Sequence, residues 1–319
     1  MKQYSNIIND ELERVVIAAC TSLALEVTAS PKPGNVHRFK DDIDTRFEHF
    51  IVSSFAVIPT ISEAVKRGYF LGLHIVDYWG VGVGELIYEG VREAKRWHKG
   101  GNTNLGTLTL MAPLVVATSS VITAYGLIDL NKISGIIMRI IRESTEDDAI
   151  YFYKAIREAN PSYLGRLDYW GLPEVFDPLY ELKIRRRGIT LLDILHSSSL
   201  WDIVMRELYI GYANILGPYL QVYKEFNKKY DWNTATVLTY LYILSNEVDS
   251  IIRRKYGLPF ALKIREKAKE TLNKILSEND TAILHELDKL LSCLEANPGS
   301  VADFLAPIIM IGLLEGIKP

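Results

Sequence analysis

The sequence has 319 residues, of which 48% are hydrophobic and 24% are charged, a composition typical of a folded globular protein. Its 36 basic and 39 acidic side chains leave a net charge of −3, so we expect no non-specific binding to nucleic acid. The cysteines, Cys20 and Cys293, are isolated in apolar patterns. They form no disulfide framework and no metal motif, which favours a reducing, cytoplasmic location.

Apolar residues recur every three or four positions along most of the chain, a spacing typical of helices. The first pattern runs from Ile7 to Val27 and ends where Pro31, Pro33 and Gly34 prevent a helix from continuing. Further patterns predict helices over 43–67, 73–97, 105–128, 129–142 and 144–160.

The segment 161–188 has no regular pattern, and we expect a long connection there with aromatic anchors. Thr190 and Asp193 then have the spacing of a capping box at a helix start. Helices are predicted over 190–228, 233–255, 259–277, 281–295 and 301–316. No repeat or flexible linker divides the chain, so we predict a single all-α domain over residues 1–319, a multi-helix bundle of about ten helices.

One predicted helix is uncharged. The segment from Leu105 to Ile128 contains 24 residues without a charge, long enough to cross a bilayer. A helix enclosed by other helices has the same composition, because it has no face toward solvent. One isolated span fits poorly with the rest of the chain, so we predict a buried central apolar helix and expect no membrane association.

Familiar cofactor signatures do not occur in the sequence. Gly80, Gly82 and Gly84 lack the spacing of a dinucleotide-binding loop and follow no predicted strand. There is no GxxxxGK[ST] phosphate loop, and the histidines show no paired metal-ligand spacing.

Three loops rich in Pro, Gly, Asn and Asp precede apolar segments, at 31–35, 100–106 and 297–303. The second and third lead into predicted helix N-termini, where backbone N–H groups bind anions. Carboxylates elsewhere can hold Mg²⁺ against a phosphate chain: Asp41, Asp42, Asp44, Glu146, Asp147, Asp148 and Asp249. The cations that can neutralise such a chain are Lys32, Arg253, Arg254 and Lys255.

Some of these residues have a purely structural alternative. The pairs Thr145–Asp148 and Ser300–Asp303 both have the spacing of a capping box. Glu26 is less easily explained, because a carboxylate next to a buried helix face needs a partner or a function.

Other candidates are equally open. Asn102 and Asn104 can satisfy a tight turn, a common role of asparagine. Asp249 and Arg253 are four residues apart and can form an ion pair on a helix face.

At these loops the sequence resembles the triphosphoribosyl-dephospho-CoA synthase family. The family's Glu-Val-x3-Pro-Lys-Pro-Gly-x-Val segment matches 26–36, and its Asp-Met-Asp is similar to 42–44. Its Asn-Thr-His-Lys-Gly loop matches 102–106, and its Pro-Gly-Gly-Ser-Ala-Asp-Leu-Leu-Ala segment is similar to 298–306.

The middle loop departs from the main family, because Asn104 and Leu105 stand in place of His-Lys. A divergent and mostly archaeal branch carries Asn-Thr-Asn-Leu-Gly, as this sequence does. That branch also has an Asp-Ser/Thr-x-Ile-x-x-Lys-x-Gly segment, which resembles 249–257.

The resemblance implies an all-α transferase. Its members move the 5-triphosphoribosyl group of ATP to the 2′-hydroxyl of 3′-dephospho-CoA and release adenine. The product is a prosthetic-group precursor for citrate lyase or malonate decarboxylase. Breaking the glycosidic bond requires a positioned carboxylate, a donor for the leaving base, and Mg²⁺ with cations for the triphosphate.

We assign candidate roles on this basis. The catalytic candidates are Glu26 and Asp44, and the Mg²⁺ ligands are Asp42, Asp44 and Asp148. The candidates for binding substrate or nucleotide are Lys32, Pro33, Gly34, Asn102, Thr103, Asn104, Gly106, Asp249, Arg253, Lys255, Gly299, Ser300 and Asp303.

Two alternatives stay open. The changed pair at Asn104 and Leu105 is consistent with ribosyl or phosphoribosyl transfer to another acceptor, such as a pterin-type cofactor precursor. The uncharged segment 105–128 is consistent with a non-catalytic helical protein that binds nucleotide or associates with a membrane. A homodimer is a further hypothesis, since large apolar helical surfaces often pair.

Overall fold

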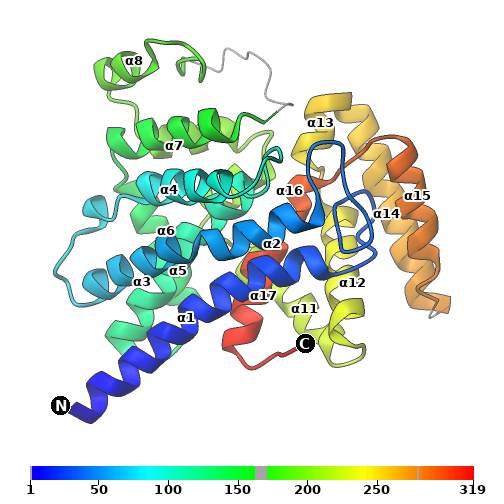
Figure 1. Cartoon of the computed structure of the whole chain (residues 1–319), viewed down its shortest axis with the longest axis horizontal. Helices are drawn as coiled ribbons and strands as arrows, with labels where there is room; N and C mark the ends of the chain where they lie inside the picture. Colours follow the sequence, from blue (N-terminus) through cyan, green and yellow to red (C-terminus); the bar gives the residue numbers. More distant parts are fainter. Residues whose placement is uncertain (1, 162–170, 279) are drawn as a thin grey trace.

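The computed structural model describes residues 2–161, 171–278 and 280–319 (Figure 1). Regular structure in these ranges is helical, without a β-strand, which confirms the all-α prediction. The helices in these ranges outnumber the predicted ten, because several predicted helices are divided.

The N-terminal part begins with α1 (Lys2–Thr28), a long helix that ends before the predicted proline-rich stop. The predicted helix over 43–67 is divided into α2 (Phe47–Ala56) and α3 (Ile58–Gly72). The helix predicted from residue 73 is instead η1 (Tyr78–Gly80) followed by α4 (Val83–Arg96). It starts late because His74 and Gly82 have φ angles of 57° and 63°, which are incompatible with a helix interior.

The middle of the chain follows the sequence prediction closely. It consists of α5 (Leu105–Tyr125), α6 (Leu130–Arg142) and α7 (Glu146–Ala159). Asp129 caps α6, because its side chain accepts from the amide of Lys132 at 3.1 Å. The expected connection over 161–188 contains a further helix, α8 (Tyr180–Arg187), and residues 162–170 within it lie outside the described part.

In the C-terminal part, three predicted helices are divided. The segments over 190–228 are α9 (Leu191–Ser198), α10 (Ile203–Tyr209), η2 (Ile215–Tyr219) and α11 (Leu220–Asn227). They are followed by α12 (Trp232–Asn246), α13 (Ser250–Tyr256), α14 (Leu258–Glu278), α15 (Ile283–Cys293), α16 (Gly299–Ala302) and α17 (Leu305–Leu314).

The divisions have local causes. The side chains of Asp202 and Asp249 accept from backbone amides two and three residues further on, so they start α10 and α13. Between α10 and η2, Gly211 and Tyr212 have positive φ angles of 67° and 63°. Apolar periodicity alone does not reveal such interruptions, because it continues across them.

The uncharged helix α5 is the centre of the molecule, as predicted. It packs against α1, α3, α4 and α6, and 94% of its most apolar 18-residue window is buried (Figure 1). By length and composition α5 is also the described helix that could span a membrane, a test that buried core helices pass too. Gly68 and Gly72 of α3 allow close contact, since a Cβ there would lie 2.3 Å and 2.6 Å from backbone oxygens of α5.

Four chain segments converge at one end of α5. They are the end of α1, the loop between α1 and α2, the N-terminal turn of α5, and the α13–α16 region. The α1–α2 loop lies beside α13 and α15 (Figure 1). The three loops singled out in the sequence are therefore neighbours in the structure.

Candidate active site

A polar cavity occupies this junction. It contains about 800 Å³ of empty space, part of which is continuous with solvent. Among the described residues, its acidic and basic lining side chains are four carboxyl groups and one ammonium group, Glu26, Asp42, Asp44, Asp303 and Lys255. Its other lining residues include Asn35, Asn102, Thr103, Gly106, Thr107, Asn297 and Gly299.

The backbone of the proline-rich loop is held by hydrogen bonds with side chains from other parts of the chain. The hydroxyl of Tyr240 donates to the carbonyl of Pro33 at 2.8 Å. The amide of Gly34 donates to Asp288 at 2.9 Å, and Lys40 donates to the same carboxylate at 2.8 Å. Gly34 has a φ of 80°, which favours glycine. This loop therefore has an anchored shape, and Pro33 and Gly34 support the cavity without lining it.

Glu26 and Lys32 form a buried ion pair beneath the cavity. Lys32 is fully buried and donates to Glu26, whose carboxylate lines the cavity. Burial raises the pKa of Glu26 and lowers the pKa of Lys32, while each charge opposes the shift of the other. Lys32 thus holds the catalytic candidate in place, and the prediction that it contacts phosphate is not supported by its position.

Asp42 and Asp44 stand on the loop side of the cavity. Asp42 accepts from the side-chain amide of Asn297 at 2.6 Å, which joins the first and last motif loops. Asn297 also accepts from Asn35 at 2.9 Å. Asp44 lies against Gly101, where a Cβ would be 2.3 Å from its Oδ2. The middle loop thus needs glycine at 101 to fit beside this carboxylate.

The middle loop presents only some of its side chains to the cavity. Asn102 accepts from the amide of Leu105 at 3.0 Å, the turn-stabilising role considered as its alternative, and it also lines the cavity. The hydroxyl of Thr103 lies 3.0 Å from that of Ser53. Asn104 does not line the polar cavity but a small space that His98 also lines, and its Nδ2 has no hydrogen-bond partner among the described residues. The predicted contact of Asn104 with ribose or adenine is therefore not supported.

Asp303 is held at the N-terminal turn of α5. The hydroxyl of Thr107 donates to its Oδ1 at 2.5 Å. Burial raises the pKa of Asp303 to about 8, against the hydrogen bond from Thr107 and with the help of the negative charges of Glu26, Asp249 and Asp202. Asp303 is thus a carboxyl group that retains its proton at neutral pH.

A family model matches this chain over residues 12–319, and its description is ATP:dephospho-CoA triphosphoribosyl transferase. The chain belongs to this family. The match spans nearly the whole sequence, including all three motif loops that meet at the polar cavity. No curated protein gives a significant match.

A solved structure has a similar fold. It is the crystal structure of a candidate triphosphoribosyl-dephospho-CoA synthase from Archaeoglobus fulgidus. The alignment has a TM-score of 0.63 and 23% sequence identity, and it covers 86% of this chain and all of the other. At this identity the likeness establishes the fold alone.

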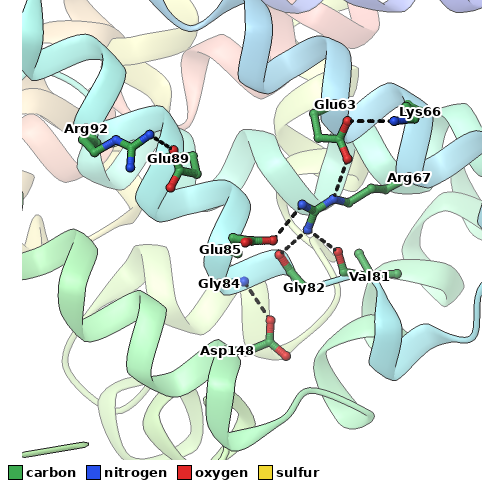
Figure 2. A network of polar contacts seen from close by, with 10 residues as sticks. All are labelled: Glu63, Lys66, Arg67, Val81, Gly82, Gly84, Glu85, Glu89, Arg92 and Asp148. Atoms are coloured by element: carbon green, nitrogen blue, oxygen red, sulfur yellow. Dashed lines mark hydrogen bonds and ion pairs between the residues drawn. The ribbon is translucent and has the colours of Figure 1, made fainter.

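Asp148, the third predicted Mg²⁺ ligand of the family site, has a structural role instead. Figure 2 shows its carboxylate accepting from the amide of Gly84, at 2.9 Å, which joins α7 to α4. Its Oδ2 accepts from the amide and hydroxyl of Thr145 at 2.8 and 2.9 Å, as in the predicted capping box. It does not line the polar cavity and is therefore separate from Asp42 and Asp44.

Asp249 and Arg253 also lie outside the cavity lining. Asp249 caps α13 and accepts from the amide of Val301 at 3.0 Å, which fixes α13 to α16. Arg253 extends toward the carbonyl of Leu200. The alternative ion pair between them is not among the described contacts, and their position outside this cavity gives no support to the predicted substrate contact. Ser300 is buried and lies on the far side of α16, beside a second cavity.

The polar lining residues that sequence reasoning did not select include Asn35, Thr45, Thr107 and Asn297. Asn35 and Asn297 belong to the motif loops, and they connect those loops to Asp42. Thr107 follows the middle motif by one residue. Its position in the first turn of α5 could have indicated a role in the site, because a hydroxyl group there lies near the helix N-terminus.

Proposed function

We propose that this protein transfers the triphosphoribosyl group of ATP to the 2′-hydroxyl of 3′-dephospho-CoA and releases adenine. The observation that supports this is the convergence of the three family motif loops on one cavity lined by four carboxyl groups and Lys255. The setting is a reducing cytoplasm, and the product serves as the prosthetic-group precursor for citrate lyase or malonate decarboxylase.

Mg²⁺ belongs in this proposal with the substrate. The described residues contain no cluster of three or more metal-ligating side chains. Mg²⁺ is commonly bound by one or two carboxylates together with substrate phosphates, so Asp42 and Asp44 fit such a role. When bound, the ion would neutralise the triphosphate.

The protein side chains divide the remaining tasks. Lys255 and the backbone amides in the first turn of α5, near Gly106, bind phosphate oxygens. Glu26 or Asp44 stabilises the oxocarbenium-like transition state or accepts the proton of the acceptor hydroxyl. Lys32 keeps Glu26 in position.

The test is to measure adenine release from ATP and Mg²⁺ with and without 3′-dephospho-CoA, by chromatography and mass spectrometry. We expect adenine only when both substrates are present, together with a product whose mass is their sum less adenine. Release without dephospho-CoA, or only with another acceptor, would contradict the proposed acceptor. No release from folded protein would contradict the activity.

A matched pair of variants tests the cavity itself. Lys255→Ala removes the ammonium group that lines the cavity, and we expect the KM for ATP to rise about tenfold, equivalent to ~1.4 kcal/mol. Lys263→Ala removes an exposed ammonium group from α14 outside the cavity and should leave KM unchanged. Equal effects of the two variants would argue against this cavity as the triphosphate site.

A further inference from the structure

A second cavity adjoins the polar one. It contains about 950 Å³ of empty space, part of which is continuous with solvent. Both cavities are lined by Leu105, Gly106, Ile251 and Asp303. These four residues form the boundary between the cavities, and Asp303 is the carboxyl group that reaches both.

The walls of the second cavity are mainly aromatic and aliphatic. Its apolar lining includes Phe152, Tyr153, Ile156, Leu172, Ile194, Trp201, Val204 and Met205. The guanidinium of Arg254 lies 4.2 Å from the ring centroid of Trp201. Among the described residues, its polar and charged side chains besides Arg254 and Asp303 are Glu174, Ser198, Asp202, Ser250 and Ser300. We call this the apolar cavity.

The proposed donor has two parts that match the two cavities. The triphosphate is strongly anionic and suits the polar cavity, which contains Lys255 and the N-terminal turn of α5, and where Asp42 and Asp44 would hold the accompanying Mg²⁺. A purine base is flat and uncharged and suits an apolar, aromatic-lined pocket with a few polar groups. The glycosidic bond that breaks joins the base to the ribose that carries the triphosphate. This bond therefore has to lie at the boundary between the two cavities.

We propose that the apolar cavity binds the adenine base of ATP, and that Asp303 at the boundary donates a proton to that base as it leaves. This inference rests on the proposed function. It adds a binding site for the leaving group and a general acid. The sequence analysis assigns Asp303, the proposed acid, only to substrate binding.

In the proposed transfer one bond breaks, one bond forms and two protons move. The bond between ribose C1′ and the adenine nitrogen breaks, and its electron pair goes to the base. The base takes the proton of Asp303 at a ring nitrogen. A bond forms between C1′ and the acceptor hydroxyl oxygen, whose proton passes to Glu26 or Asp44. Proton exchange through solvent then restores Asp303, so no oxidant or reductant is required.

The surroundings of Asp303 suit this role. The raised pKa keeps the carboxyl protonated at neutral pH, so it can act as an acid. Thr107 occupies Oδ1 by donating to it. Oδ2 lies against Gly106, where a Cβ would be only 2.0 Å away. The hydrogen bond from Thr107 therefore positions the carboxyl group through Oδ1, and Oδ2 does not take part in that hydrogen bond.

The binding site is tested with free adenine, which needs no catalysis. We expect saturable adenine binding by calorimetry and, in the transferase assay, inhibition competitive with ATP. Cytosine is the control and should bind at least tenfold more weakly. Absence of saturable adenine binding to the folded protein, or inhibition that is not competitive with ATP, would overturn the adenine site.

Two variants locate that binding. Trp201→Leu should weaken adenine binding about tenfold, whereas Trp97→Leu, at an exposed tryptophan outside both cavities, should not. If Trp201→Leu does not fold, Met205→Trp fills the same cavity and should also weaken binding. Unchanged adenine affinity in a folded variant of either kind would place the base elsewhere.

The acid role needs a readout that a structural role would not change. With ATP, Asp303→Asn should lower kcat on the order of 10²–10⁴. A purine nucleoside triphosphate methylated at N7 has a base that leaves without protonation, so with this donor the deficit should fall below tenfold. An equal deficit with both donors would overturn the acid role.

These outcomes are separate from failure of the proposed function. If wild-type protein releases no adenine with any acceptor, the transferase activity is wrong. Adenine binding that Trp201→Leu weakens would still support the cavity as a purine site.

Discussion

At the scale of single residues, the four carboxyl groups of the polar cavity differ in what surrounds them. Glu26 is paired with a buried lysine, Asp42 accepts from Asn297, and Asp303 accepts from a threonine hydroxyl. Asp44 is exposed at the cavity edge. Different surroundings allow chemically similar groups to act as acid, base or metal ligand in one site.

The first prediction concerns pH. Burial and the nearby charges of Glu26, Asp249 and Asp202 raise the pKa of Asp303 to about 8, so its protonated fraction falls above that pH. We expect kcat/KM to fall as pH rises past about 8, because the general acid is lost. Asp303→Asn should have a lower rate without this alkaline limb. A limb that persists unchanged in the variant would assign it to another group.

The second prediction concerns the buried ion pair. Lys32→Met leaves the carboxylate of Glu26 buried without its partner, and we expect a loss of about 3–5 kcal/mol in the free energy of unfolding, measured with urea. Lys66→Met is the control, because Lys66 and Glu63 form an exposed pair worth less than about 1 kcal/mol.

A double variant tests the cause of that loss. Adding Glu26→Gln to Lys32→Met removes the buried charge, so the combined loss should be smaller than the sum of the two single losses. Additive losses would mean that the two side chains do not interact.

At the scale of elements, the start of α5 and the loops before it position the carboxylates. Gly101 and Gly106 provide the space that Asp44 and Asp303 occupy. Asp148, in the capping box of α7, also accepts from α4, and Asp249, the cap of α13, also accepts from α16, so each carboxylate joins two helices. These glycines and these hydrogen bonds thus fix the positions of the segments that line the cavity.

The third prediction concerns Gly106. In Gly106→Ala the new Cβ would lie 2.0 Å from Oδ2 of Asp303, so the carboxyl group has to move. We expect kcat to fall about 10²-fold, as for other small displacements of reacting groups. Gly135→Ala is the matched control in α6, because a Cβ there meets nothing within 4 Å. Wild-type kcat in Gly106→Ala would contradict a catalytic position for Asp303.

The fourth prediction separates two acidic residues by their magnesium dependence. Asp44→Asn should raise the Mg²⁺ concentration for half-maximal activity about tenfold, because it removes a proposed ligand. Asp148→Ala should leave that concentration unchanged and instead lower unfolding free energy by about 0.5–2 kcal/mol, because it removes half of the capping box and the acceptor of the Gly84 amide. The reverse pattern would restore Asp148 as the metal ligand.

At the scale of the whole molecule, α5 connects the site to the core. Its N-terminal turn carries Leu105, Gly106 and Thr107 into the cavities, while the rest is enclosed by neighbouring helices. The site therefore stands at the end of a largely buried helix, which restricts its movement.

The fifth prediction tests this packing. Gly68→Ala or Gly72→Ala places a Cβ within 2.3–2.6 Å of backbone oxygens of α5, so α3 has to move away. We expect a loss of about 1–3 kcal/mol in unfolding free energy. Gly135→Ala should be neutral or stabilising by up to about 1 kcal/mol. Unfolding in denaturant, followed by circular dichroism, measures all three.

Much of the helical structure could be predicted from the sequence. Capping at Asp129, Thr145 and Thr190 depends on residues three positions apart, and both the caps and the apolar periodicity are visible in a short window. The breaks before Ile203 and Ser250 were missed, because an aspartate inside a continuing apolar pattern is a cap in one context and a surface charge in another.

The sequence by itself determined the all-α class, the buried central helix and the three motif loops that identify the family. Only the tertiary structure decided which of the candidate residues face a common cavity. It removed Asp148 and Asn104 from the cavity lining, and it revealed the apolar cavity beside Asp303. The physical reason is range: caps and periodicity act over three or four residues, whereas the walls of a cavity come from residues as distant as Glu26 and Asp303.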